Sequence, residues 1–549
     1  MACTTILVGK DASYDGSTIV ARNEDSPGGQ FEPKRMQVVL PKDQPRVYTS
    51  VESHLTIDLP EEPMRYTSVP DAIEGHGVWA AAGFNELNVG MSATETITSN
   101  ERVLGADPLV MYTPASGVEG EEGYVPACPG GLGEEDFVTL VLPYIRSARE
   151  GVERLGALLE KYGTYEMNGI AFSDVDEIWW LETVGGHHWI AKRVPDDMYV
   201  TMPNQLGIDW FDLGDAEGEQ LEHMASPDLR AWMTDNHLDL MLRGEYAFFS
   251  EDEYELIEDE DDDYIEDLDE DLDDDGVDGD DLEDVFVLDA GRFEDIFNPR
   301  EAFGSRSDSD HVYNTPRAWY MQRFLNPHDV WEGPFADYTP ESDDIPWARV
   351  PERKVTIEDV KYVLSAHYQG TPYDPYGKHG TPETRSLYRP IGINRNGQLA
   401  VLQVRPYVDE DHRAIQWMAF GSNPFNALVP FYANVDTLPE YLCNTAATVT
   451  TDSFYWSNRL IAALADARFR DNAAHIERYQ EKVGARGHQM LRETDRAVAD
   501  ASGEELVRAL EQANDRMARF LREQTDALLG KVLHTTSLSM RNGFAMSDN

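Results

Sequence analysis

Cys3 is the residue of this chain whose type and position predict chemistry most directly. It is followed by the apolar run 4–8, which indicates a strand. If residues 1 and 2 are removed, Cys3 carries a free α-amine with a pKa near ~8, which can serve as general base for its own thiol. Since thiols are strong nucleophiles near neutral pH, we predict acyl transfer at Cys3. The alternative for such a cysteine is a small buried apolar side chain.

Arg22 and Asp25 follow in the spacing Arg-x-x-Asp, soon after the turn sequence at 15–18. A guanidinium near the thiol favours the thiolate, and a carboxylate can orient the α-amine through a charge-assisted hydrogen bond. The alternative is an ordinary surface ion pair, which contributes less than ~1 kcal/mol. We predict that both residues belong to the site of Cys3.

Hydrophobic periodicity predicts the elements that position these residues. Apolar segments bounded by turns indicate strands at 4–8, 17–21, 36–40, 47–50, 77–81, 89–94, 168–172, 177–183, 189–193, 399–404, 414–419 and 427–432. Helical spacing indicates helices over 137–162 and 216–242, and a helical region from 453 to about 533. Periodicity therefore predicts a mixed α and β protein.

The first 25 residues resemble the opening of bacterial cysteine dipeptidases of the N-terminal-nucleophile (Ntn) hydrolase superfamily, which are related to penicillin V acylase and bile salt hydrolase. The resemblance is carried by the segments at 3–9, 15–18, 22–25, 186–189, 193–197, 313–319 and 367–374. It covers roughly residues 3 to 460. The resemblance implies an α+β fold, a four-layer αββα sandwich, and hydrolysis of dipeptides through a thioester on Cys3.

The resemblance also implies further site residues. Asn204 lies where the relatives have an asparagine that donates to the oxyanion, and Arg317 matches their last active-site arginine. By itself, Arg317 can equally cap carbonyls at a helix start, or hold the carboxylate of a dipeptide. Ser92 occupies the place where we expect an acylase to have a second asparagine, so the second oxyanion donor is not identified by the sequence.

Two alternatives to a dipeptidase remain. An amidase of the acylase or bile salt hydrolase type has the same mechanism, but Ser92 and the dipeptidase motifs argue against it. A non-catalytic binding protein on the same scaffold would use the acidic tract at 251–284 to recruit cations or basic partners.

Charge is distributed unevenly along the chain. The net charge is −57, which argues against nucleic acid as a partner. Residues 251–284 hold 23 acidic side chains and no Lys or Arg. This composition predicts a disordered acidic insertion at about 249–286, within a catalytic domain at 1–452 that precedes a helical region at 453–549.

Several classes of protein are disfavoured by what the sequence lacks. No apolar run approaches the ~18 residues of a membrane span, and no secretory signal is recognisable. The chain has three cysteines and no HExxH or CxxC pair, so we expect neither a metal nor another cofactor, and His187 and His188 are interpreted as packing groups. We therefore expect a cytoplasmic homo-oligomer that acts on small dipeptides and binds neither membranes nor nucleic acid.

Overall fold

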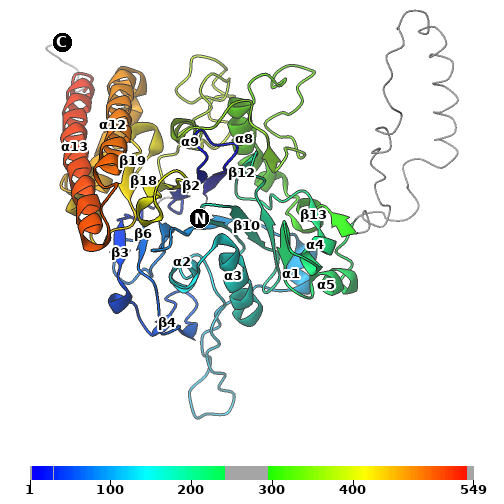
Figure 1. Cartoon of the computed structure of the whole chain (residues 1–549). Coiled ribbons are helices and arrows are strands. Elements are labelled where there is room, and N and C mark those ends of the chain that lie inside the picture. Colours follow the sequence, from blue (N-terminus) through cyan, green and yellow to red (C-terminus); the bar gives the residue numbers. More distant parts are fainter. Residues whose placement is uncertain (1–2, 29, 241–294, 541–549) are drawn as a thin grey trace, which may run out of the picture.

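The computed structural model describes residues 3–28, 30–240 and 295–540 (Figure 1). The insertion predicted at about 249–286 lies outside the described residues. The strands that are described form two large sheets and three short hairpin-like pairs, and pairing between them is antiparallel throughout.

The first sheet has seven strands and holds the start of the chain at its centre. In spatial order its strands are β16 (Ala348–Arg349), β12 (Tyr199–Met202), β1 (Thr4–Val8), β2 (Thr18–Asp25), β17 (Asn396–Val404), β18 (Ala414–Phe420) and β19 (Val429–Tyr432). Every residue of β1, β2 and β17 is buried. A central strand that is buried along its whole length must be covered on both faces, which explains the continuous apolar runs in its sequence.

The second sheet has six strands and packs against the first. Its strands are, in spatial order, β14 (His223–Ala225), β11 (Trp189–Arg193), β10 (Ile178–Thr183), β9 (Asn168–Ser173), β8 (Gly90–Thr96) and β7 (Ala82–Phe84). The two sheets meet where β2 contacts β8 and β9 and where β7 contacts β17 and β18. Cys3 therefore lies at the start of a strand whose one face is turned towards the second sheet.

Helices cover the outer faces of both sheets. Helices α2 (Phe137–Val141) and α3 (Ala148–Tyr162) contact the second sheet, and α3 buries a stripe of apolar residues on β9 to β11. Helices α8 (Asp308–Leu325) and α9 (Ile357–Leu364) contact β12, β1 and β2 of the first sheet. In Figure 1 these two groups of helices lie on opposite sides of the strands.

Three helices complete the chain: α11 (Phe454–Ala465), α12 (Phe469–Ala497) and α13 (Gly503–Ser537). Helices α12 and α13 pack along each other beside β18 and β19 (Figure 1). Asn514 on α13 caps the edge strand β19, because its side chain both accepts from the N–H and donates to the carbonyl of Tyr432, at 2.9 and 3.0 Å. The helical end of the chain is thus bonded to the sheet that carries Cys3.

Smaller elements connect these layers. They are the strand pairs β3 (Gln37–Val39) with β6 (Tyr66–Ser68), β4 (Val47–Thr49) with β5 (Thr56–Asp58), and β13 (Phe211–Asp212) with β15 (Ile296–Phe297), and the helices α1 (Glu101–Ala106), α4 (Leu213–Glu217), α5 (Leu229–Asp235), α7 (Pro299–Phe303) and α10 (Glu440–Cys443). Among the helices of the described residues, none is sufficiently long and apolar to cross a membrane.

The structure confirms a mixed α and β protein with a helical end, and corrects three element predictions. The helix predicted over 137–162 is interrupted after α2 by a 3-10 turn at Leu142–Tyr144 that contains Pro143, since proline cannot donate to a helical hydrogen bond. The stretch 77–81 is not a strand, because Trp79 and Ala81 have left-handed φ angles of 47° and 56°.

The third correction concerns the helix predicted over 216–242. Its described part contains the end of α4, strand β14 and helix α5, and residues 241–242 lie outside the described residues. The apolar residues of this stretch serve two short helices and an edge strand, so helical spacing over the whole window was misleading.

Candidate functional site

Cys3 is fully buried directly before β1, and strand pairing brings Arg22 to its thiol. In the β1–β2 register Thr5 lies opposite Arg22. Because side chains two residues apart share a face of a strand, Cys3, Thr5 and Arg22 all point towards the second sheet. Nη1 of Arg22 is 3.2 Å from Sγ of Cys3.

The guanidinium of Arg22 is fixed by groups from two other segments. It donates to the carbonyl of Thr94 and, at 2.8 Å, to that of Ala93 in β8. It also pairs with the carboxylates of Glu134 and Glu24, both at 3.3 Å. All three charged side chains are buried. The cation beside the thiol is therefore held in place by the second sheet and by the loop that precedes α2.

The protonation of Cys3 depends on opposing effects. Burial raises the pKa of the thiol far above its usual value; the charge of Arg22 lowers it, and those of Glu134 and Glu95 raise it. The resting sulfur is consequently a thiol. Nucleophilic attack then requires a base within reach that removes the proton as the sulfur reacts.

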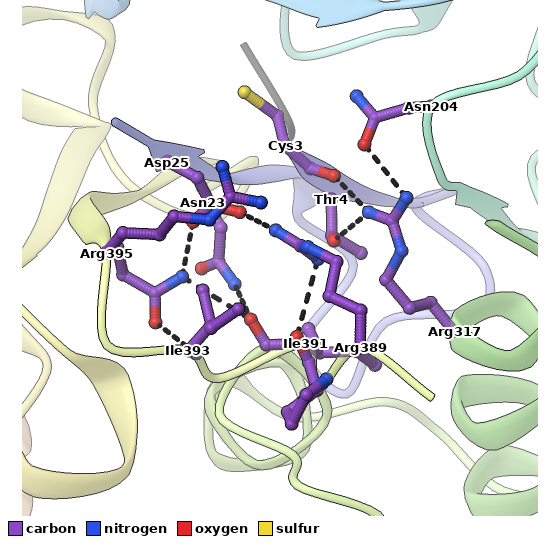
Figure 2. A network of polar contacts seen from close by, with 12 residues as sticks. Cys3, Thr4, Asn23, Asp25, Asn204, Arg317, Arg389, Ile391, Ile393 and Arg395 are labelled. Carbon is purple, nitrogen blue, oxygen red and sulfur yellow. Dashed lines mark hydrogen bonds and ion pairs between the residues drawn. The ribbon is translucent and has the colours of Figure 1, made fainter. Parts of the chain in front are cut away.

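Asn204 and Arg317 meet on the other side of the Cys3 backbone (Figure 2). Asn204 follows β12, the neighbour of β1, and its Nδ2 donates to the carbonyl of Thr96 at 2.9 Å. Its Oδ1 accepts from Nη2 of Arg317 at 2.8 Å. Arg317 also donates through Nη1 to the carbonyl of Cys3 and to Oγ1 of Thr4, the latter at 2.8 Å. The amide of Asn204 is thus oriented by an arginine that also holds the nucleophile's backbone.

All N–H groups of Arg317 are used within the protein. The remaining two donate from Nε to the carbonyl of Tyr313 at 3.2 Å and from Nη2 to Oδ1 of Asn314 at 2.5 Å. Its side chain is fully buried. Arg317 lies in the middle of α8 and not at a helix start, and it has no donor left for a substrate carboxylate. Its contacts are those of a residue that positions Cys3 and Asn204.

Asp25 lies at the end of β2 and is fully buried. It pairs with Nη2 of Arg389, and its Oδ1 accepts from Nδ2 of Asn396 at 2.5 Å. Since Asp25 is three residues from Arg22, the two side chains leave the strand on opposite faces. The structure therefore places Arg22 at the thiol and Asp25 beside a second arginine. Among the described residues, the side chain of Asp25 bonds Arg389 and Asn396 and makes no hydrogen bond to Cys3.

Comparison with known proteins identifies the family. The sequence profile of peptidase family C69 matches residues 2–482. This chain belongs to peptidase family C69. Among curated relatives, it is 56% identical to a protein named dipeptidase from Bifidobacterium longum and 50% identical to a probable dipeptidase A from Streptococcus pyogenes serotype M3, in both cases over 100% of each chain. It is 42% identical to dipeptidase A of Lactobacillus helveticus, over 97% of this chain and 96% of that one.

The family assignment confirms the resemblance seen in the sequence and the prediction of a cysteine-type peptidase. In this C69 peptidase, Ser92 is buried in β8 and its hydroxyl has no hydrogen-bond partner among the described residues. The second oxyanion donor is therefore not assigned. His187 and His188 both bond Asp107, at 3.0 and 2.7 Å, which agrees with their interpretation as packing groups.

Four charged residues near Cys3 were not identified from the sequence: Glu95, Glu134, Arg389 and Arg395. Glu95 is the only charged residue of β8, and its presence in a buried strand was a usable signal. Glu134 lies in an acidic run after two glycines, and the two arginines flank a Pro-Ile-Gly turn. Neither pattern distinguishes a site from an exposed loop. The described residues contain no group of three or more His, Cys, Asp or Glu side chains arranged to bind a metal.

Proposed function

We propose that this member of family C69 is a cysteine dipeptidase whose nucleophile is Cys3. The observation that carries the proposal is the buried Cys3 thiol at the start of a central strand, 3.2 Å from the Arg22 guanidinium, in a chain that aligns over its full length with proteins named dipeptidases. Removal of residues 1 and 2 frees the α-amine of Cys3, which is then the base nearest to the thiol.

The reaction then proceeds in two acyl transfers. The α-amine takes the thiol proton while Sγ attacks the peptide carbonyl carbon, and the resulting tetrahedral oxyanion accepts hydrogen bonds from Asn204 and from backbone N–H groups. The α-ammonium returns the proton to the leaving amino acid, and the C–N bond breaks to give a thioester on Cys3. Water, deprotonated by the same amine, attacks the thioester and releases the second amino acid.

The other site residues support these steps. Arg22 stabilises negative charge on sulfur. Arg317 holds the backbone of Cys3 and the amide of Asn204 in a fixed relation. Asp25 shares the buried pair with Arg389 and provides a negative charge that favours an ammonium on the freed α-amine.

The layers of the fold support assignment to the Ntn-hydrolase superfamily. Two antiparallel sheets that face each other, with α2 and α3 on one side and α8 and α9 on the other, fit a four-layer αββα sandwich. We assign residues 1–452 to this catalytic domain and 453–549 to the helical region. A cytoplasmic homo-oligomer without a cofactor remains part of the proposal, and sedimentation of the purified protein measures the oligomeric state.

Two measurements test this function. A panel of free dipeptides is incubated with wild type and with Cys3→Ala, and we expect hydrolysis by wild type alone. Equal hydrolysis by both proteins contradicts the proposal. Intact-mass spectrometry of active protein should give a chain that starts at Cys3, and a fully active chain that starts at residue 1 or 2 excludes the α-amine as base. Penicillin V and a conjugated bile acid, tested in parallel, separate a dipeptidase from the acylase type.

A further inference from the structure

Two buried carboxylates lie on the Arg22 side of Cys3. Oε1 of Glu134 is 3.3 Å from the same Arg22 nitrogen that is 3.2 Å from the Cys3 sulfur. Oε2 of Glu95 accepts from Oγ1 of Thr5 at 2.7 Å. Glu134 is 1% exposed and Glu95 is fully buried. The second carboxylate oxygen of each, Oε2 of Glu134 and Oε1 of Glu95, has no hydrogen-bond partner among the described residues.

The charges in this group do not balance. Arg22 is shared among Glu24, Glu134 and the Cys3 sulfur, and the second cation, Lys34, pairs with Glu24 and Asp71. Glu166 lies next to Glu134 and accepts a hydrogen bond from its N–H at 2.6 Å. Burial and the neighbouring charge of Glu134 raise the pKa of Glu166 to about 7. Buried carboxylates that repel each other and keep unbonded oxygens are stabilised by an added cation.

The opposite imbalance occurs around Tyr313. The guanidinium groups of Arg317 and Arg389 lie 5.1 and 5.3 Å from its ring centre, and Nη2 of Arg395 donates to its hydroxyl at 2.8 Å. Arg389 has Asp25 as its carboxylate partner. Arg395 is partly buried and makes no ion pair with any described residue; its other bond, at 3.1 Å, goes to the carbonyl of Ser26.

The positive group lies in the same network of polar contacts as Cys3 (Figure 2). Burial and the charge of Arg395 together lower the pKa of Arg389 to about 9, with the charge of Cys3 acting against both. Figure 2 shows Arg389 and Arg395 on the Asp25 side of Cys3. Since Arg22 and Asp25 leave β2 on opposite faces, the acidic and basic groups lie on different sides of the nucleophile.

We propose that Glu134 and Glu95 bind the α-ammonium of a free dipeptide and that Arg395 binds its α-carboxylate. The inference rests on the proposed function and specifies how substrate is selected. The two ends of an extended dipeptide are separated by about 7 Å, and each added residue moves the carboxylate by about 3.5 Å. A site that binds both charged ends therefore accepts dipeptides and disfavours longer or end-blocked peptides.

The freed α-amine of Cys3 is a competing cation for the acidic group. If Glu134 serves that amine, its removal slows every substrate to the same extent. If it binds substrate, its removal slows substrates with a free ammonium more than substrates whose amino end is blocked. The chemical state of the peptide ends therefore separates the two roles.

The test compares Ala-Ala with N-acetyl-Ala-Ala, Ala-Ala-amide and Ala-Ala-Ala, on wild type, Glu134→Gln and Arg395→Gln. We expect Glu134→Gln to lower kcat/KM for Ala-Ala by about 10- to 100-fold, chiefly through KM, as is typical for loss of a hydrogen bond to a charged group. Because Glu134 also pairs with Arg22 and acts on the pKa of Cys3, part of the loss should appear with N-acetyl-Ala-Ala, but that loss should be clearly smaller than the loss with Ala-Ala. Arg395→Gln should lower kcat/KM for Ala-Ala by a similar factor and leave kcat/KM for Ala-Ala-amide unchanged. Arg395→Lys should restore part of the loss with Ala-Ala.

Two loop residues provide matched controls. Glu122 is exposed, and Arg385 is partly buried, bonds the backbone carbonyls of His379 and Gly380, and lies in the same connection as Arg389. Glu122→Gln and Arg385→Gln remove the same charges and should leave all four substrates unaffected. An equal loss on free and acetylated peptides in Glu134→Gln overturns the ammonium role. An equal loss on Ala-Ala and its amide in Arg395→Gln overturns the carboxylate role.

Binding to an inactive variant separates this inference from the proposed function. Calorimetry with Cys3→Ala measures the affinity for Ala-Ala without turnover, and adding Glu134→Gln or Arg395→Gln should weaken it about tenfold or more. Selective binding without hydrolysis by wild type leaves the two-ended site intact and contradicts the peptidase mechanism. Equal hydrolysis of free, acetylated and amidated peptides contradicts the two-ended site but not the proposed peptidase function.

Discussion

One nitrogen of Arg22 lies 3.2 Å from the sulfur of Cys3 and 3.3 Å from Oε1 of Glu134. This single guanidinium nitrogen therefore joins the nucleophile to the group that we assign to substrate recognition. The arrangement follows from the β1–β2 register, which sets Arg22 opposite Thr5. The thiolate of Cys3 and the carboxylate of Glu134 compete for this one cation. A second cation that binds Glu134 therefore changes how strongly Arg22 stabilises the thiolate.

Replacing Arg22 should make the thiol less acidic. Arg22 acts against burial, which raises the pKa of Cys3, and an opposite charge at this distance typically changes a pKa by about 1 to 3. In Arg22→Gln we expect the pH dependence of Cys3 alkylation by iodoacetamide to move upward by that amount, with kcat/KM reduced at least about tenfold. Arg22→Lys should be intermediate. Arg46→Gln, at an exposed site, is the control, and an unchanged alkylation profile in Arg22→Gln contradicts the assignment.

Asn204 should affect kcat more than KM. Asn204→Asp keeps an oxygen for Arg317 but loses the amide donor, and removing one oxyanion donor costs about 100- to 1,000-fold in kcat. Asn204→Ala should show a similar loss. If Asn204 only packs against Arg317, Asn204→Asp will retain most of the activity while Asn204→Ala will lose stability, which thermal unfolding measures.

The part of the site that lies on two consecutive strands could be predicted from the sequence. Cys3 and Arg22 are joined by one hairpin, so their position in two adjacent apolar runs was enough to predict that they lie together. Asn204 and Arg317 required the family resemblance, because no local pattern relates residues 113 positions apart. The alternative in which Arg317 caps carbonyls at a helix start does not apply, since α8 begins at Asp308 and continues through Pro316.

The charged residues that we assign to substrate binding could not be predicted from the sequence, for a physical reason. Glu95 and Glu134 bond Thr5 and Arg22 only because the second sheet packs on the first, and Arg395 bonds Tyr313 from the turn before β17. Periodicity predicts which face of a strand is buried, but it does not predict which buried faces meet. Periodicity predicted most strands correctly. It wrongly predicted one helix across 216–242, where the chain forms several short elements.

Stability should fall as pH rises because of Glu182 on β10. Burial raises its pKa to about 7, although the carboxylate accepts hydrogen bonds from Trp180 and from the N–H of Gly207, at 3.0 and 2.7 Å. Between the unfolded pKa near ~4.3 and about 7, the folded chain holds a proton that the unfolded chain has released. The free energy of unfolding therefore decreases with pH across this window.

Glu182→Gln tests this linkage. It should make the dependence of the unfolding free energy on pH between 5 and 7 shallower by up to about 1.4 kcal/mol per pH unit, the value for one proton. Urea unfolding at several pH values measures the slope. Glu160→Gln is the control, because Glu160 also accepts from a tryptophan but is exposed. An unchanged slope in Glu182→Gln shows that this carboxyl is ionised throughout.

Deleting residues 251–284 should spare hydrolysis. The proposed mechanism uses no residue of this stretch, and its 23 acidic side chains without Lys or Arg predict a segment outside the catalytic core. We expect kcat/KM for dipeptides to stay within about twofold of wild type. Loss of activity on deletion, with the rest of the chain folded by circular dichroism, contradicts the division of the chain into a catalytic core and an acidic insertion.

The hydrogen bond from Thr5 to Glu95 should set the acidic limb of the pH profile. Burial raises the pKa of Glu95 to about 8, and the charge of Arg317 and the Thr5 hydroxyl act against burial. Only the ionised carboxylate binds an ammonium, so kcat/KM for dipeptides should rise as Glu95 ionises. Thr5→Val has nearly the same shape as threonine but no donor, so the carboxylate loses stabilisation, its pKa rises, and the limb moves to higher pH. Thr5→Ser keeps the donor and should retain the wild-type profile. Identical profiles for Thr5→Val and wild type, or the same displacement with N-acetyl-Ala-Ala, would show that Glu95 does not act on the substrate ammonium.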